Sequence, residues 1–423
     1  MIDTSPDRPE HVRRVPLSTI AAQWTRIGCV GFGGPPAHIS LLRRLCVTER
    51  RWLSDTEFED GIAATNLLPG PASTQLAIFC AWRLRGTVGG LLGGTCFILP
   101  GLALILALAA LFLGSPPTWV QGAAAGAGSA VAAVAVHAAA GLVPGSWRRA
   151  TTGATGHSPL FGARNRWLAY LVAGLAAGAA AGPYLVVVLV ACGLLEVAAR
   201  RPPRPGAPRP GTPRPGTPGS RAPAGRPAVS VLPLLAAPAA GIAGAGGLGG
   251  LAWVALKVGL LSYGGGFVII PLMQADAVSR YHWMSDGQFL NAVALGQVTP
   301  GPVVQTVAVV GYAAAGLGGG LLAAFVAFVP SFVLVLFGAQ RFDRLRAEPR
   351  VQTFLTGAGP AVIGAIGGSA VPLAGGLAHR WQVAVLIGAA IWLLLLRRNV
   401  VPALLLAGAL GTAAAVIGLP VTA

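Results

Sequence analysis

Residues 66–75 read NLLPGPASTQ, and residues 297–306 read QVTPGPVVQT, with a Pro-Gly-Pro triplet at the centre of each stretch. Proline has no amide N–H and clashes with the preceding helical turn, so neither triplet can remain helical. Each break frees carbonyl oxygens before it and starts a new half-helix after it. A turn at a membrane surface is one interpretation. The long apolar runs around both triplets favour two broken helices that line a transport pathway.

Apolar runs fill most of the chain. Hydrophobic residues make up 54% of the 423 residues and charged residues only 10%, whereas about a quarter of the residues in soluble domains is charged. A bilayer core of about 30 Å needs about 20 apolar residues per helix, which predicts an all-α polytopic membrane protein with about 10 to 13 transmembrane helices. The expected spans are residues 18–38, 56–85, 87–113, 118–143, 166–181, 183–199, 230–250, 251–271, 286–315, 317–338, 352–376, 380–396 and 399–419.

The chain repeats itself. The motif WLSD at residues 52–55 recurs 231 residues later as WMSD at residues 283–286, and the two Pro-Gly-Pro triplets share this spacing. Residues 201–227 are dense in proline and arginine and contain no acidic residue, which is typical of an extended linker. We therefore predict an N-terminal polar tail (1–16), a first repeat (17–199), a cytoplasmic linker (200–228) and a second repeat (229–423).

Short clusters of arginine mark the loops between the apolar runs, as they do in membrane proteins. The net charge is +17, but no basic stripe interleaved with aromatic residues is present, so we expect no nucleic-acid partner. The arginine-rich loops change sides between the repeats, which predicts two homologous halves in an inverted, antiparallel arrangement. One loop disagrees: Arg43, Arg44, Arg50 and Arg51 would lie outside, unless they form an interfacial helix or the first span does not cross.

Each repeat also carries a glycine-rich stretch, GFGGPPAH from residue 31 and SYGGGFVIIP from residue 262. Small residues inside an apolar span break the helix and expose backbone amides, which suit an oxyanion at the start of a half-helix. Close helix packing through small residues is the alternative. The duplication favours the anion site, whose candidate residues are Phe32, Gly33, Gly34, Pro35, Tyr263, Gly264, Gly265 and Gly266.

Neutral polar residues flank both triplets, and such groups can replace water around an oxyanion without holding it permanently. The candidate substrate-binding residues here are Asn66, Pro69, Gly70, Pro71, Ser73, Gln75, Gln297, Thr299, Pro300, Gly301, Pro302 and Gln305.

A single cation stands at equivalent places in the two repeats, Arg26 and Lys257. A buried intramembrane cation is costly unless it is paired. Because no carboxylate in the same spans offers a partner, we interpret a dianionic substrate as one partner, and snorkelling to the membrane surface as an equal alternative. The sequence shows no paired carboxylates for a proton relay, although Glu59 or Asp60 can serve alone.

The motifs FGGPPAH, WLSD with WMSD, Pro-Gly-Pro with Ser-Thr-Gln, RLRG at 83–86, and SYGGGF with TPGP together resemble the chromate ion transporter family in its long, two-domain form. The resemblance covers nearly the whole chain apart from the tail and the linker. It implies an inner-membrane protein that exports chromate, confers chromate resistance and uses the proton motive force. Sulfate, a dianion of similar tetrahedral shape, is the implied competitor. Cys29 and residues 297–299 depart from the pattern, so the two half-sites can differ.

Three other functions were weighed. The same machinery can carry sulfate or another oxyanion instead of chromate. A channel fits duplicated broken helices less well than a rocking carrier does. A membrane-embedded redox enzyme would need ligands such as HExxH or CxxC, and the sequence has neither. We therefore expect no catalytic residues, metal or cofactor, and the partners are the substrate anion and the lipid bilayer, with a homodimer left open.

Overall fold

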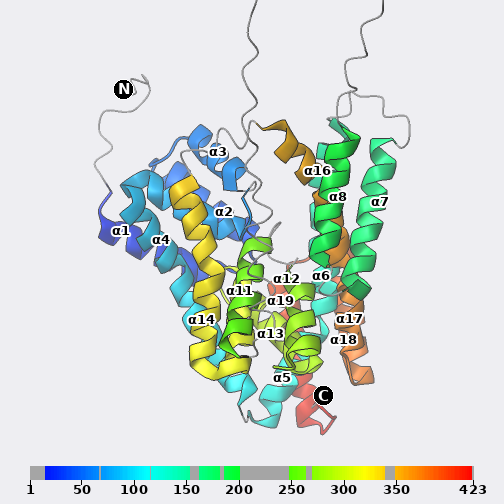
Figure 1. Ribbon diagram of the computed structural model, residues 1–423. Helices are drawn as coiled ribbons and strands as arrows, with labels where there is room; N and C mark the ends of the chain where they lie inside the picture. The colour runs from blue at the N-terminus through cyan, green and yellow to red at the C-terminus, as the bar shows by residue number, and fades with distance from the viewer. Residues whose placement is uncertain are drawn as a thin grey trace, which may run out of the picture.

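The computed structural model describes residues 15–65, 68–114, 116–152, 162–181, 185–200, 247–262, 269–338 and 348–421. In these ranges the chain forms helices joined by short turns, and no strand occurs (Figure 1). Four helical segments of the described chain are long and apolar enough to cross a membrane: Ala72–Leu113, Thr118–Thr151, Val303–Gly338 and Pro349–Gly375. The protein is therefore an all-α, multi-pass membrane protein, as expected. The expected span 230–250 and nearly all of the linker lie outside the described residues.

The first repeat forms a series of helices that follow the expected spans. They are α1 (Leu17–Val30), α2 (Pro35–Arg43), a π-helical turn (Arg44–Glu49), α3 (Asp55–Thr65), α4 (Ala72–Leu113), α5 (Thr118–Ser129), α6 (Val131–Thr152), α7 (Ala163–Ala176) with a π-helical end (Ala177–Ala181), and α8 (Leu185–Ala199). The span expected at 18–38 is instead broken, because α1 ends at Val30 after 14 residues. At 1.5 Å per residue α1 is about 21 Å long, which is too short to cross the bilayer alone.

The second repeat forms a matching series. Its helices are α11 (Leu248–Leu261), α12 (Ile269–Gln274), a π-helical turn (Ala275–Arg280), α13 (Asp286–Val298), a 3-10 turn (Val303–Gln305), α14 (Thr306–Gly338), α16 (Pro349–Gly368), α17 (Ala370–Gly375), α18 (Arg380–Ala390) with a π-helical end (Ile391–Leu395), and α19 (Val400–Val416). The breaks at both Pro-Gly-Pro triplets separate α3 from α4 and α13 from α14.

The long helices α4 and α14 contain the same sharp bend. In α4 the bend lies at Arg85 (φ −143°, ψ 23°) and Gly86 (φ 61°, ψ −154°). In α14 it lies 230 residues later, at Ala315 (φ −152°, ψ 33°) and Gly316 (φ 61°, ψ −155°). The positive φ favours glycine at the second position. Each helix is thus a hairpin of two segments that pack closely through small residues.

The WxSD motifs terminate a second matched structure. Both follow a π-helical turn and a residue with positive φ, Arg51 (50°) and His282 (52°). The N–H of Trp52 donates to the carbonyl oxygen of Cys46 at 2.7 Å, and the N–H of Trp283 donates to that of Ala277 at 2.8 Å. The serine of each motif then caps the following helix, α3 or α13. The motif therefore sets the direction in which these helices leave the turn.

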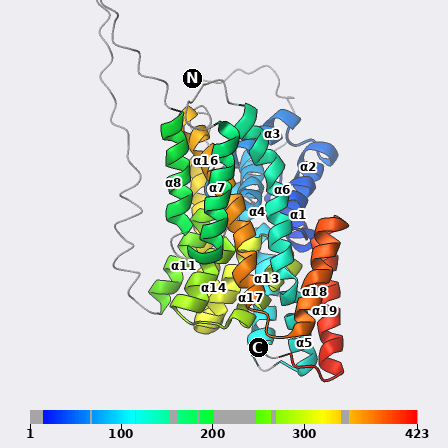
Figure 2. The same ribbon diagram turned by 90° about the vertical axis from the view of Figure 1, so that its right-hand side faces the viewer.

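The helices pack in three groups (Figures 1 and 2). The first group contains α1, α4, α11 and α14, whose apolar side chains share one core with those of α3 and α13. The second contains α7, α8 and α16, and the third contains α5, α18 and α19, which lie together along one edge in Figure 2. All of the helical breaks predicted from the sequence lie in the first group, so its core positions the candidate site.

Candidate functional site

The second triplet, Pro300–Pro302, is completely enclosed by protein and contacts the glycine-rich break of the first repeat. The backbone N–H of Gly301 donates a hydrogen bond of 3.0 Å to the carbonyl oxygen of Gly31. The ring Nε2 of His38, at the start of α2, lies 2.8 Å from the same oxygen. Gly301 has a φ of 106°, a conformation that favours glycine. The two predicted breaks therefore meet across the boundary between the repeats.

Gly101 of α4 provides the space for this triplet. A methyl group at Gly101 would stand 2.1 Å from the carbonyl oxygen of Pro300 and 2.6 Å from Oε1 of Gln305. The Gln305 side chain is buried, and its Nε2 donates to the carbonyl oxygen of Ile98 at 2.8 Å. The start of α14 is thus fixed to the middle of α4 by both shape and hydrogen bonding.

The first triplet, Pro69–Pro71, makes the corresponding contacts with the second repeat. Gly70 has a φ of 120°. A methyl group on it would stand 3.1 Å from Oγ of Ser331 in α14 and 3.3 Å from the carbonyl oxygen of Gly259 in α11. Nε2 of Gln75 donates to the carbonyl oxygen of Pro69 at 2.7 Å. Pro69 itself is exposed, whereas Gly70 and Pro71 are buried.

These contacts are reciprocal. Ser331 stands 230 residues after Gly101, and each faces the triplet of the other repeat. The same holds for a second pair of contacts, because a methyl group at Gly90 would meet Leu336 at 2.7 Å and one at Gly320 would meet Leu106 at 2.5 Å. Equivalent residues of the two repeats therefore use the same surfaces toward each other.

Buried polar atoms without a hydrogen-bond partner gather around the two breaks. They are Thr74 Oγ1, Gln75 Oε1, Ser262 Oγ, Gln297 Nε2, Gln305 Oε1, Ser331 Oγ and His38 Nδ1. An unsatisfied buried polar atom costs about 1–3 kcal/mol, so such a concentration calls for a guest that can hydrogen-bond. The hydroxyls and the Gln297 amide can donate to an oxyanion. The two free glutamine oxygens can accept from water or from a protonated oxyanion.

The remaining candidates fall into three groups. Asn66, Tyr263, Gly264, Gly265 and Gly266 lie outside the described residues. Ser73 is buried, while Phe32 and Gly33 are exposed, Gly34 and Pro35 are half-buried, and Gly34 is close to Val303 of the other repeat. Thr299 is buried, but its hydroxyl already donates to the carbonyl oxygen of Leu295 at 2.8 Å.

Ser262, Ser331 and His38 were missing from the predicted site. Ser262 opens the SYGGGF motif, and His38 closes FGGPPAH, so both stand next to recognised signals. Ser331 follows a proline in the middle of an apolar helix, and only its position against Gly70 reveals it.

The structure corrects the interpretation of Lys257. We expected no carboxylate partner in its span, but its ammonium Nζ forms a salt bridge with Oδ2 of Asp276, in the π-helical turn after α12. Asp276 lies beyond the expected span 251–271, so sequence spacing could not reveal the contact. The equivalent cation, Arg26, is exposed on α1. Its position fits snorkelling better than a buried binding site.

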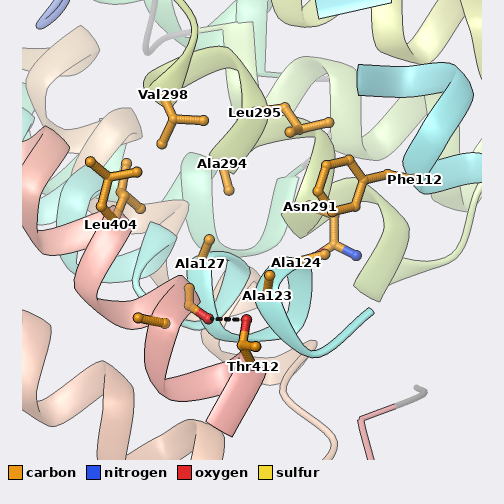
Figure 3. A pocket seen from close by; sticks show the side chains of 13 residues that line it. Phe112, Ala123, Ala124, Ala127, Asn291, Ala294, Leu295, Val298, Leu404 and Thr412 are labelled. Carbon is orange, nitrogen blue, oxygen red and sulfur yellow. Dashed lines mark hydrogen bonds between the residues drawn. The ribbon is translucent and has the colours of Figure 1, made fainter. Parts of the chain in front are cut away.

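Figure 3 shows a cavity of about 270 Å³ between α5, α13 and α19. Its lining is mostly apolar, with Asn291 and Thr412 as the polar side chains, and Thr412 Oγ1 donates to the carbonyl oxygen of Gly408 at 3.2 Å. None of the predicted site residues lines this cavity. Among the described residues, no group of three or more His, Cys, Asp or Glu side chains could hold a metal ion.

Comparisons with known proteins agree with this architecture. The sequence profile of the family described as "Chromate transporter" matches residues 18–197 and 249–413, one segment in each repeat. A chromate transport protein of Cupriavidus metallidurans is 30% identical over 85% of this chain and 82% of its own length. One from Pseudomonas aeruginosa is 31% identical over 85% of this chain and 81% of its own length.

A probable chromate transport protein of Synechococcus elongatus is 29% identical over 84% of both chains. No solved structure matches this chain. The matched segments contain every helical break described above, and they leave out the linker between the repeats.

Proposed function

This chain belongs to the chromate transporter family, and from that membership and the geometry of the two breaks we propose that it exports chromate from the cytoplasm by alternating access. Its relatives are named as transport proteins, and the chain is a membrane transporter rather than an enzyme. Export across the inner, or plasma, membrane would confer chromate resistance. The proton motive force is the proposed energy source.

One observation carries the proposal: each Pro-Gly-Pro break contacts the other repeat and is surrounded by buried polar atoms without partners. Neutral hydroxyls and amides can bind a dianion and release it again, which a fixed cluster of cations would hinder. The half-helices α4 and α14 begin at these breaks, and their first turns present free backbone N–H groups. We place the substrate between the two triplets.

An inverted arrangement of the repeats is part of the proposal. Reciprocal contacts such as Gly90 with Leu336 and Gly320 with Leu106 are those of two units related by a twofold axis. An axis in the membrane plane inverts the second repeat, and the alternating arginine loops of the sequence favour this choice over an axis along the membrane normal. Rocking one repeat against the other would then open the breaks to each side in turn.

Transport of labelled chromate by the purified protein in proteoliposomes tests the proposed function. We expect counterflow of chromate without a pH gradient, and net movement against a concentration gradient when a proton motive force is imposed. Unlabelled sulfate is expected to compete. Movement of sulfate without chromate would replace chromate as the substrate, and single-channel currents would replace the carrier with a channel.

A further inference from the structure

Lys257 and Asp276 form an ion pair inside the apolar body of the second repeat. The side chain of Lys257 is 17% exposed and that of Asp276 only 4%. Lys257 Nζ also lies 5.8 Å from the ring centroid of Trp253, one turn earlier on α11. Removing two charges from water is costly, and their mutual attraction repays the cost only partly. A buried pair of this kind therefore points to a role beyond folding.

The first repeat folds without such a pair. The residue equivalent to Asp276 is Leu45, 231 positions earlier, and it stands in the matching π-helical turn. The residue equivalent to Lys257 is Arg26, which is exposed. Because the two turns share their backbone hydrogen bonds, the charges are not required to form this structure. The pair is an addition specific to the second repeat.

The carboxylate of Asp276 has a free oxygen. Lys257 contacts Oδ2, whereas Oδ1 is buried and has no hydrogen-bond partner, like Gln274 Oε1 and the hydroxyl of Tyr281 nearby in the sequence. The other charged groups around this turn are Asp286 of α13, which accepts from Gln274 Nε2 at 3.1 Å, and the exposed side chains of Arg280 and His282. A proton on Oδ1 would neutralise the carboxylate and turn an unsatisfied acceptor into a donor.

The ion pair is also near the proposed substrate site. Lys257 precedes Gly259 by two residues on α11, about 3 Å along the helix axis. The carbonyl oxygen of Gly259 borders Gly70, and α11 ends at Ser262, whose buried hydroxyl has no partner. A change in charge at Lys257 therefore acts on the helix that forms one wall of the first break.

We infer that Asp276 is a proton-binding group that controls the affinity for the substrate anion, an inference that rests on the proposed function. When Asp276 is ionised, it neutralises Lys257 and opposes the approach of a dianion. When Oδ1 binds a proton from water, the pair gains a net positive charge, and Lys257 is released from its counter-ion. Linkage requires the reciprocal effect, so a bound dianion favours protonation of Asp276.

The test compares the half-saturating chromate concentration of counterflow in four proteins over mildly acidic to mildly alkaline pH. They are the wild type, Asp276→Asn, the double variant Lys257→Gln with Asp276→Asn, and Asp55→Asn as a matched control, since Asp55 is an exposed carboxylate paired with Arg43. Protonation of chromate itself affects all four equally. We expect the wild type and the control to bind about tenfold more weakly as the pH rises. Asp276→Asn should keep the tight value of acidic pH throughout.

The same pH dependence in Asp276→Asn as in the control would overturn the inference. If Asp276→Asn does not fold, the double variant decides, because it leaves no unpaired charge. It should bind weakly and show no pH dependence beyond that of chromate, and a wild-type pH dependence there would overturn the inference too. Absence of chromate counterflow in the wild type would instead contradict the proposed function, so the two failures are distinguishable.

Discussion

The backbone N–H of Gly301 donates a hydrogen bond of 3.0 Å to the carbonyl oxygen of Gly31, and this bond joins a break in the second repeat to a break in the first. Neither residue has an intrahelical partner at that atom, because each stands where its helix is interrupted. Backbone groups freed inside a membrane protein must be satisfied by protein, water or a ligand. Here part of that requirement is met between the repeats, and the unpartnered side chains around it leave room for a guest.

Close packing at Gly101 should be essential for this junction. In Gly101→Ala the new methyl group would meet the Pro300 carbonyl oxygen at 2.1 Å, so the triplet would have to shift. We expect counterflow of chromate to be lost while the protein still inserts into the membrane. Gly141→Ala on α6 is the matched control, because nothing lies within 4 Å of its new methyl group. Equal transport by both variants would show that the junction does not matter.

Replacing Pro300, Gly301 and Pro302 by alanine should join α13 to α14 in one continuous helix. The freed amides at the start of α14 would then be used within the helix, and export should be abolished although the protein remains in the membrane. Membrane fractionation together with a chromate-resistance assay checks both parts. Pro144→Ala, which removes an exposed proline inside α6, should keep normal resistance. Normal resistance in the triple variant would contradict a site at this triplet.

Ser331 offers an unpartnered donor beside Gly70. Ser331→Ala removes no hydrogen bond within the protein, so its thermal stability should stay the same or increase. A hydrogen bond to a charged group contributes about 1.5–3 kcal/mol. We therefore expect chromate affinity to fall by at least about tenfold. Ser129→Ala is the control, since Ser129 Oγ already donates to Ala125 at 2.6 Å. An unchanged affinity in Ser331→Ala would place the anion elsewhere.

Lys257→Gln should weaken anion binding and also leave Asp276 without its partner. Breaking a buried ion pair from one side costs about 3–5 kcal/mol, so the melting temperature should fall as well. The exposed cation at the equivalent position allows a comparison, and Arg26→Gln should change stability by no more than about 0.5 kcal/mol. Thermal unfolding and half-saturation measured on the same samples separate the two effects. An unchanged half-saturation in Lys257→Gln would favour a purely structural role.

The inverted arrangement predicts where equivalent residues meet water. Arg51 and His282 are exposed and occupy the same place after their π-helical turns. In a background without the native cysteines, Arg51→Cys and His282→Cys should therefore react with a membrane-impermeant maleimide from opposite sides. Labelling of both from one side would show that the repeats are parallel.

Local features of the chain were predictable, and contacts between the repeats were not. The breaks at Pro69–Pro71 and Pro300–Pro302, and the boundary near Gly86, follow from residues that cannot continue a helix. The facing of Gly70 and Ser331 depends on how α4 packs against α14, which no local pattern encodes. The partner of Lys257 escaped prediction for a related reason: α11 and α12 fold back on each other, and their contact joins residues 19 positions apart.

A density map of the full-length protein in lipid with saturating chromate tests the central claim most directly. The account predicts an oxyanion enclosed between the two repeats, within hydrogen-bonding distance of Ser331 or of the amides that start α4 and α14. Density for the anion only in another place, such as the apolar cavity of Figure 3, with both triplets still packed against protein alone, would contradict it.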